Sequence, residues 1–238
     1  MNEKQEKVAF SIAHLEALYS DSLTIESLRE LKNIAFYSSR TGPDIFIIGG
    51  WAAWRYHRGI GSRDIDIVFH DRRTLEHFLH KYFRENGFEI FGNPFNARYR
   101  KPIASGERTV YIEIDAASFD EDRPFKEDSA IRLPFSELDD HFDVWVIEDS
   151  LVKIPCPELL LLQKIKALRD RTWDLVHIAR SSQDIAYLNS KILKDEYDIR
   201  GIYPFIRDWD LLWSIARRNK CHRFIEDSLR SSGLEMKV

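Results

Sequence analysis

The stretch IIGGWAAWRYHRGIGSRDIDIVF, residues 47–69, decides the fold. It opens with an apolar run that leads into Gly49 and Gly50, and it closes with "DIDIVF", in which acidic and apolar residues alternate. Alternate residues of a β-strand face the same way, so this pattern predicts Asp64 and Asp66 on one face. Two adjacent carboxylates repel each other, and the pair is costly unless a cation or a proton lies between them. The stretch therefore predicts a site for positive charge.

The composition is that of an ordinary globular protein. Of 238 residues, 44% are hydrophobic and 31% are charged, which suits one large domain or two small ones. The net charge of −4 argues against a general polyanion binder. Only two cysteines occur, so no disulfide framework is expected and a reducing cytosol fits. The acidic N-terminal segment does not resemble a signal peptide, and the apolar runs are too short to cross a bilayer, so we expect a cytoplasmic protein with no membrane partner.

Periodicity along the chain predicts an α+β fold with a mixed sheet, flanking helices and helical N- and C-terminal extensions. The expected strands are 45–50, 64–69, 88–91, 97–100, 108–117 and 142–147. The expected helices are 4–38, 51–57, 71–87, 155–171 and most of the chain after 173, and residues 118–140 read as irregular. The expected regions are an N-terminal helical extension (1–40), a core (41–172) and a C-terminal helical region (173–238).

The strand ends and turns of the core predict a metal and phosphate site. Gly49 and Gly50 lie between a strand and a helix, where backbone N–H groups can hold an anion. Carboxylate oxygens suit Mg²⁺, which commonly binds through one or two carboxylates and substrate phosphates. A further strand, "RTVYIEIDAA" (108–117), places Glu113 and Asp115 on one face.

Together these features resemble the nucleotidyltransferase superfamily related to DNA polymerase β. Its signature is an apolar strand, Gly-Gly or Gly-Ser, a spacer and Asp-x-Asp, and the acidic pair Asp64 and Asp66 fits that spacing here. Ser62 precedes the pair, as Ser or Thr often does in the family. The family also has a third acidic residue on a later strand, for which Asp115 is the best match and Glu113 the alternative.

A narrower resemblance covers residues 45–188. "GGWAAWRYH" is similar to the opening motif of antibiotic nucleotidyltransferases and of abortive-infection type nucleotidyltransferase toxins. "IPCPELLLLQKIKALRDR" is similar to the helix that follows their core, with Lys164, Ala167 and Arg171 at the matching positions.

Two later positions of that narrower pattern fit less well. The family continues with a basic residue and Asp, then a second Asp three residues later. Arg180 and Asp184 fit this element, but Ser181 stands in place of the first Asp. Relatives often have Arg two residues before the Ser or Thr, where this chain has Ile60, with Arg58 or Arg63 as possible substitutes.

The resemblance implies Mg²⁺-dependent transfer of a nucleoside monophosphate from a nucleoside triphosphate to an acceptor hydroxyl, with release of pyrophosphate. Asp64 and Asp66 would hold two Mg²⁺ ions, and Asp115 would ligate the second ion and take the hydroxyl proton.

The phosphate contacts follow from the same resemblance. The β- and γ-phosphates would lie on the Gly49–Gly50 backbone and near Ser62, and Lys164 would offset their charge. A lysine at the edge of the apolar stripe of helix 157–171 can deliver its ammonium to a cleft. Lys166 is expected to be solvated.

The acceptor stays open between a small hydroxyl compound, a tRNA end and a protein side chain. The acidic net charge slightly disfavours a large RNA, whereas residues 213–224 carry a local basic cluster. The alternative is a non-catalytic nucleotide-binding module, or one half of a toxin–antitoxin pair with an antitoxin partner. Two further motifs are expected to be structural: Trp51, Trp54 and Tyr56 as core packing, and His77 and His80 as solvated helix residues.

Overall fold

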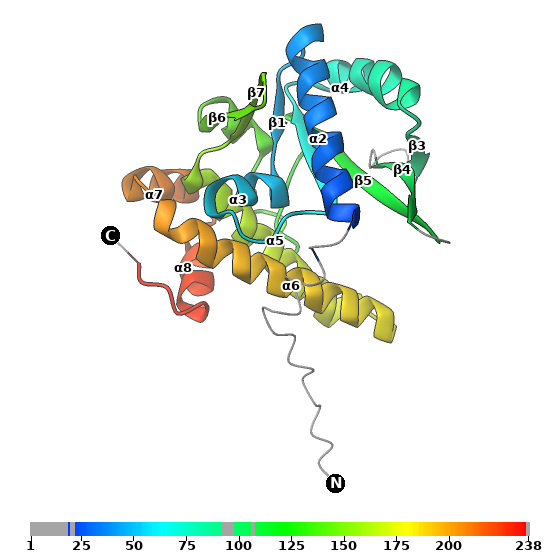
Figure 1. Cartoon of the computed structure of the whole chain (residues 1–238). Coiled ribbons are helices and arrows are strands. Elements are labelled where there is room, and N and C mark those ends of the chain that lie inside the picture. The colour runs from blue at the N-terminus through cyan, green and yellow to red at the C-terminus, as the bar shows by residue number, and fades with distance from the viewer. Residues whose placement is uncertain (1–18, 20–21, 92–97, 106–107, 237–238) are drawn as a thin grey trace.

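The computed structural model describes residue 19 and residues 22–91, 98–105 and 108–236. Their strands form one seven-stranded sheet in the order β3-β4-β5-β2-β1-β7-β6 (Figure 1). The sheet is mixed, because β2 pairs antiparallel with β1 and parallel with β5, while β1 pairs parallel with β7. The strands are β1 (Ile45–Ile47), β2 (Asp64–Phe69), β3 (Glu89–Phe91), β4 (Arg98–Ser105), β5 (Arg108–Ser118), β6 (Phe142–Ile147) and β7 (Ser150–Pro155).

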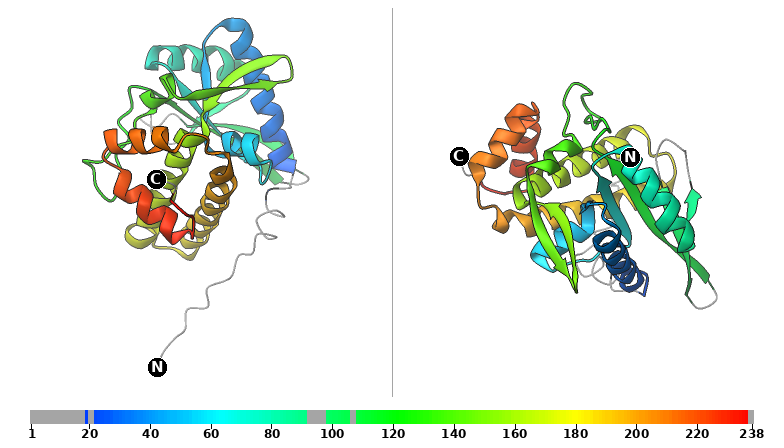
Figure 2. Two further views of the ribbon diagram at one scale, coloured as in Figure 1. Left: turned by 90° about the vertical axis from the view of Figure 1, so that its left-hand side faces the viewer. Right: turned by 90° about the horizontal axis from the view of Figure 1, so that it is seen from above.

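Helices lie on both sides of this sheet. The helices are α2 (Ser22–Thr41), α3 (Gly49–His57), α4 (Arg72–Phe78), α5 (Pro157–His177), α6 (Ser182–Ile202), α7 (Trp209–Arg218) and α8 (His222–Ser231). Figures 1 and 2 show α5 to α8 gathered on one side of the molecule, with α2 and α4 on the other. In the described part of the chain, no helix combines the length and the apolar character needed to cross a bilayer.

The alternation of β2 separates the core from the site. Ile65, Ile67 and Phe69 are buried, and the Phe69 ring centroid lies 5.1 Å from that of Phe78 in α4. Because successive side chains of a strand point to opposite faces, Asp64 and Asp66 face away from α4. They point towards the helices α5 and α6, where the candidate site lies.

The predicted α+β class with a mixed sheet and flanking helices is confirmed, and β2 and β6 have the predicted bounds. The strand predicted over 45–50 ends at Ile47, so Gly49 and Gly50 begin α3 rather than end β1. Strand β7 was not predicted. Its alternation is masked because the apolar Leu151 stands at a solvent-exposed position of the strand, where a polar residue is expected.

Two helices run across the boundaries predicted between the regions, α2 at residue 40 and α5 at residue 172. Helix α5 continues through position 172, the expected boundary, because no Gly or Pro interrupts residues 158–177. Helix α2, which lies in the region predicted as an N-terminal helical extension, contributes Leu31, Ile34 and Ala35 to the hydrophobic core. Residues 4–18 of the predicted N-terminal helix lie outside the described residues.

Candidate active site

A cavity of about 320 Å³ lies between the sheet and the helices α5 and α6. It contains every site residue predicted from the sequence. These residues are Gly49, Gly50, Ser62, Asp64, Asp66, Asp115 and Lys164. The residues predicted from the sequence therefore come from three separate parts of the chain and meet in one cavity.

The two glycines allow the start of α3 to lie directly against the acidic strand. Gly49 has a φ of +65°, and a Cβ atom built on it would lie 1.9 Å from Oδ2 of Asp66. A Cβ atom on Gly50 would lie 2.7 Å from Oγ of Ser62. The N–H of Ile48 also donates to the carbonyl oxygen of Asp66, at 3.0 Å. The N-terminus of α3, with its unpaired N–H groups, is thereby fixed beside the carboxylates.

The strand register pairs the acidic residues across the sheet. Asp66 lies opposite Asp115 on the parallel neighbour β5, and Asp64 lies opposite Glu113. Burial, followed by the charge of Asp64, raises the pKa of Asp66. Burial and the charge of Asp66 raise the pKa of Asp115 to about 6. The negative charge of Asp66 and Asp115 is therefore not fully balanced by the positive charges near them.

Asp115 fits the third acidic position better than Glu113 does. Among the described residues, Asp115 lines the cavity and Glu113 does not. The pKa of Glu113 is raised by burial and by the charge of Asp64. The strand register pairs Glu113 with Asp64, so Glu113 lies two residues before Asp115 along β5 and is not opposite Asp66.

Cationic side chains hold two of the three aspartates. Nζ of Lys191 lies 2.5 Å from Oδ2 of Asp64, and Nε of Arg98 lies 3.1 Å from Oδ1 of Asp115. Burial opposes ionisation of Asp64, but the Lys191 ammonium lowers its pKa below the ordinary range.

The donors fit a hard divalent cation in their chemistry. All three side chains offer carboxylate oxygens, which Mg²⁺ prefers, and they line one cavity. Among the described residues, however, no group of three His, Cys, Asp or Glu side chains is arranged so that it could already hold a metal ion. Lys191 and Arg98 each occupy one carboxylate oxygen, Oδ2 of Asp64 and Oδ1 of Asp115, and these two oxygens become available to a cation only when the contacts break.

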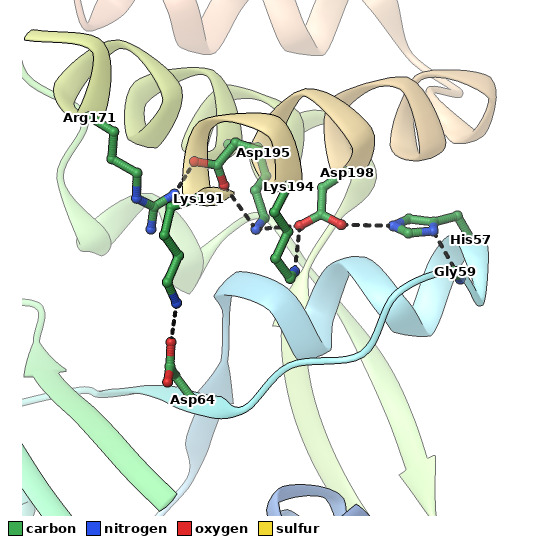
Figure 3. A network of polar contacts seen from close by, with 9 residues as sticks. His57, Gly59, Asp64, Arg171, Lys191, Lys194, Asp195 and Asp198 are labelled. Carbon is green, nitrogen blue, oxygen red and sulfur yellow. Dashed lines mark hydrogen bonds and ion pairs between the residues drawn. The ribbon is translucent and has the colours of Figure 1, made fainter. Parts of the chain in front are cut away.

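A buried charge network supports the helical wall of the cavity (Figure 3). Asp198 of α6 is fully buried and lies 2.7 Å from Nζ of Lys164, 3.1 Å from Nζ of Lys194 and 3.2 Å from Nε2 of His57. The N–H of Gly59 donates to Nδ1 of His57, so Nε2 carries the proton that faces Asp198. Burial opposes ionisation of Asp198, but the two lysines lower its pKa. The network ties α3, α5 and α6 together.

The structure changes the interpretation of two lysines on α5. Lys164 lines the cavity as predicted, but it is buried and its ammonium pairs with Asp198 and with Asp195, which lies 3.4 Å away. The prediction that Lys166 is solvated is wrong: Lys166 is buried and pairs with Asp170. The segment predicted as irregular covers it, with the Phe125 ring 5.2 Å from its Nζ.

Sequence reasoning missed the polar face of α6. Lys191, Lys194, Asp195 and Asp198 are separated by three, one and three residues, which places them on one face of a helix. All four are half-buried or buried, which is unusual for charged residues and shows that this face of α6 is turned into the fold. The signal was present as the charged spacing in "KILKDEYD".

The spacing that was expected at Arg180 and Asp184 occurs a second time on this face. Lys194 is a basic residue followed by Asp195, and Asp198 comes three residues later. Arg180 and Asp184 are exposed, and Asp184 forms a capping box with Ser181 at the start of α6.

The remaining motifs have structural roles or lie on the surface. Trp51 is buried and donates to Oγ of Ser27 at 3.1 Å, as expected for core packing. His77 and His80 are exposed, also as expected. Neither of the two arginines considered as substitutes for Ile60 lines the cavity: Arg58 stacks on Trp54 and Arg63 on Tyr19.

Comparisons with known proteins give matches among solved structures alone. No family model matches the sequence, and no curated protein matches it. An antigenic nucleotidyltransferase-like protein from Paracoccidioides brasiliensis has 14% identity and a TM-score of 0.44, over 87% of this chain and 94% of that one. The lincosamide antibiotic adenylyltransferase LnuA, solved with lincomycin, has 17% identity and a TM-score of 0.42, over 75% and 97%. The antibiotic-resistance factor ANT(2'')-Ia has 14% identity and a TM-score of 0.39, over 76% and 92%.

Proposed function

We propose that this protein is a Mg²⁺-dependent nucleotidyltransferase, which moves a nucleoside monophosphate from a nucleoside triphosphate to an acceptor hydroxyl and releases pyrophosphate. One observation carries the proposal. Asp64, Asp66 and Asp115 line the same cavity as the N-terminus of α3, which begins at Gly49. The cavity therefore combines oxygen ligands for a divalent cation with backbone donors for phosphate.

Asp64, Asp66 and Asp115 are the residues that would hold two Mg²⁺ ions. When bound, the ions would supply charge neutralisation at the triphosphate and a lowered pKa for the acceptor hydroxyl. Asp66 is the centre of this set, because it lies beside Asp115 across the sheet and against Gly49 of the turn.

The phosphate side of the cavity is formed by α3 and Ser62. The first N–H groups of α3 have no partner within the helix and carry the positive end of its dipole. Ser62 adds a hydroxyl next to Gly50. The positively charged side chains on α5 and α6 face the same space and would favour an anionic substrate.

Asp115 would accept the proton of the attacking hydroxyl. It lines the cavity opposite Asp66 on the neighbouring strand, which places a carboxylate beside the proposed metal ions to take this proton. Its side chain is about 45% exposed, so an acceptor entering from solvent can reach it. The acceptor class stays a small hydroxyl compound, a tRNA end or a protein side chain.

Calorimetry with ATP, in Mg²⁺ and then in EDTA, tests the proposal. We expect binding that requires Mg²⁺ and that is lost in Asp66→Asn. The control is Asp122→Asn, which removes an exposed carboxylate that pairs with Arg132 outside the cavity. ATP binding that is equal in EDTA, or that is unchanged in Asp66→Asn, would contradict the proposed site.

Transfer is measured separately from binding. Incubating the protein and a cell extract with ATP labelled at the α-phosphate should label an acceptor in wild type and not in Asp66→Asn. The size and nuclease or protease sensitivity of the labelled species distinguish a small molecule, an RNA and a protein. Mg²⁺-dependent binding without any transfer would favour the non-catalytic nucleotide-binding alternative.

A further inference from the structure

Lys191 bridges the two walls of the candidate active site. It belongs to α6, yet its Nζ lies 2.5 Å from Oδ2 of Asp64 on β2 (Figure 3). The side chain of Lys191 is only 16% exposed and that of Asp64 is 29% exposed. The ion pair is therefore largely shielded from water and connects the helical layer to the acidic strand.

The partner of Lys191 distinguishes it from the other cations near it. Lys164 and Lys194 are both paired with Asp198, and Arg171 is paired with Asp195. These carboxylates belong to α6 itself, so the three cations are neutralised within the helical layer. Lys191 instead takes its counter-charge from Asp64, a carboxylate that the proposed metal ions require.

Asp64 cannot keep this contact and also give the same oxygen to a divalent cation. If a cation takes Oδ2 of Asp64, the Lys191 ammonium is left in a shielded cavity without its partner, which is unfavourable. The same cavity contains the N-terminus of α3, where the proposed triphosphate would lie. A phosphate oxygen entering with the metal is the natural new partner for the ammonium.

We propose that Lys191 exchanges partners on substrate binding: it holds Asp64 in the free protein and contacts the phosphates of the nucleoside triphosphate in the complex. This inference rests on the proposed function. The exchange makes metal and nucleotide binding depend on each other, because the metal must displace Lys191 and the nucleotide then stabilises the displaced side chain. Such coupling is reciprocal and typically changes each affinity by about fivefold or more.

Lys191→Met tests the exchange through two affinities that should change in opposite directions. Mn²⁺ alone, measured by electron paramagnetic resonance, should bind about fivefold more tightly to Lys191→Met, because no ammonium competes for Asp64. ATP in saturating Mg²⁺, measured by calorimetry, should bind about fivefold more weakly, because its phosphates lose a cationic partner.

Two further variants separate a local effect from a general change in charge. Lys153→Met removes the same charge, but Lys153 pairs with Asp44 and lies outside the cavity. We expect Lys153→Met to leave Mn²⁺ affinity within twofold of wild type, because Lys153 contacts none of the three site aspartates. Lys191→Arg keeps a cation at the position and should keep both affinities close to wild type, and it also serves if Lys191→Met does not fold.

The outcomes distinguish this inference from the proposed function. If wild type binds ATP with Mg²⁺ but Lys191→Met leaves Mn²⁺ affinity unchanged or lower, partner exchange is wrong and the nucleotidyltransferase proposal stands. If Lys191→Met binds both Mn²⁺ and ATP more tightly, Lys191 blocks the site without contacting phosphate, and the exchange is again overturned. If wild type binds neither ligand, both proposals fail.

Discussion

A Cβ atom at Gly49 would lie 1.9 Å from Oδ2 of Asp66, in a backbone with a φ of +65°. Gly49→Ala should therefore carry two costs, the strain of a left-handed backbone and a steric conflict with the carboxylate. The carboxylate or the start of α3 must move to relieve the conflict. We expect lower stability in urea denaturation and loss of Mg²⁺-dependent ATP binding.

Gly87→Ala is the matched control. Gly87 has a φ of +78°, but a Cβ atom there meets no heavy atom within 4 Å. The Gly87→Ala variant should lose only the stability that the left-handed backbone costs a residue with a Cβ atom, about 1 kcal/mol, and it should retain ATP binding. Equal destabilisation by the two substitutions would mean that the close approach of Gly49 to Asp66 adds nothing to the stability lost in Gly49→Ala.

The Asp66–Asp115 pair predicts a dependence of stability on pH in metal-free buffer. Burial and the charge of Asp66 raise the pKa of Asp115 from its ordinary value of 3.8 to about 6. Between pH 4 and 6 the folded protein therefore binds more protons at this group than the unfolded chain does, so its contribution to stability falls as pH rises. Asn does not titrate, so the Asp115→Asn variant does not lose stability through this group as pH rises.

The difference between the two proteins is the quantity to measure. In EDTA, the melting temperature of Asp115→Asn minus that of wild type should increase from pH 4 to pH 6 and level off above pH 6. Subtracting wild type removes most contributions from groups that titrate in both proteins. A difference that does not change with pH would show that Asp115 is not perturbed by its neighbour.

The acidic half of the site could be predicted from sequence because it depends on local patterns. A strand has a period of two, so the alternation in "DIDIVF" is enough to place Asp64 and Asp66 on one face. The glycines after β1 are likewise a local signal of a close backbone approach. These features do not depend on how distant parts of the chain pack.

The helical half could not be predicted in the same way. The role of Lys191 depends on the packing of α6 across the sheet, 127 residues from its partner Asp64. Helix spacing groups Lys191 with Lys194 but does not show that this face is buried. Exposed charged faces have the same spacing, so the spacing alone does not separate a buried charged face from a solvated one.

The buried Asp198 predicts an asymmetry between removing an anion and removing a cation. Asp198→Asn leaves Lys164 and Lys194 with one fewer negative charge at a fully buried position, and breaking such a network costs about 3 to 5 kcal/mol. Lys194→Met should cost much less. Burial already lowers the pKa of Lys194 to about 8, which shows that its charged form is poorly solvated there.

Urea denaturation of both variants at pH 7 measures the asymmetry. Methionine has a similar length and fills the same space without a charge, so Lys194→Met is the size-matched case. If the two variants lost equal stability, Asp198 would not be the centre of the network. Circular dichroism should confirm that the helical content of each variant is native.

The last prediction separates Asp115 from Glu113 as the third acidic ligand. Both lie on the same face of β5, but Asp115 is level with Asp66 and Glu113 is level with Asp64. In the described structure Asp115 lines the cavity and Glu113 does not. Asp115→Asn should therefore weaken binding of Mn²⁺ in the presence of ATP by at least tenfold, whereas Glu113→Gln should stay within threefold of wild type, on the scale of about 1.4 kcal/mol per tenfold. Both substitutions remove one negative charge from the same strand, so their general electrostatic effects are matched. A larger loss in Glu113→Gln would move the metal-binding role to Glu113 and would place the substrate nearer to Asp64 than to the Asp66–Asp115 pair.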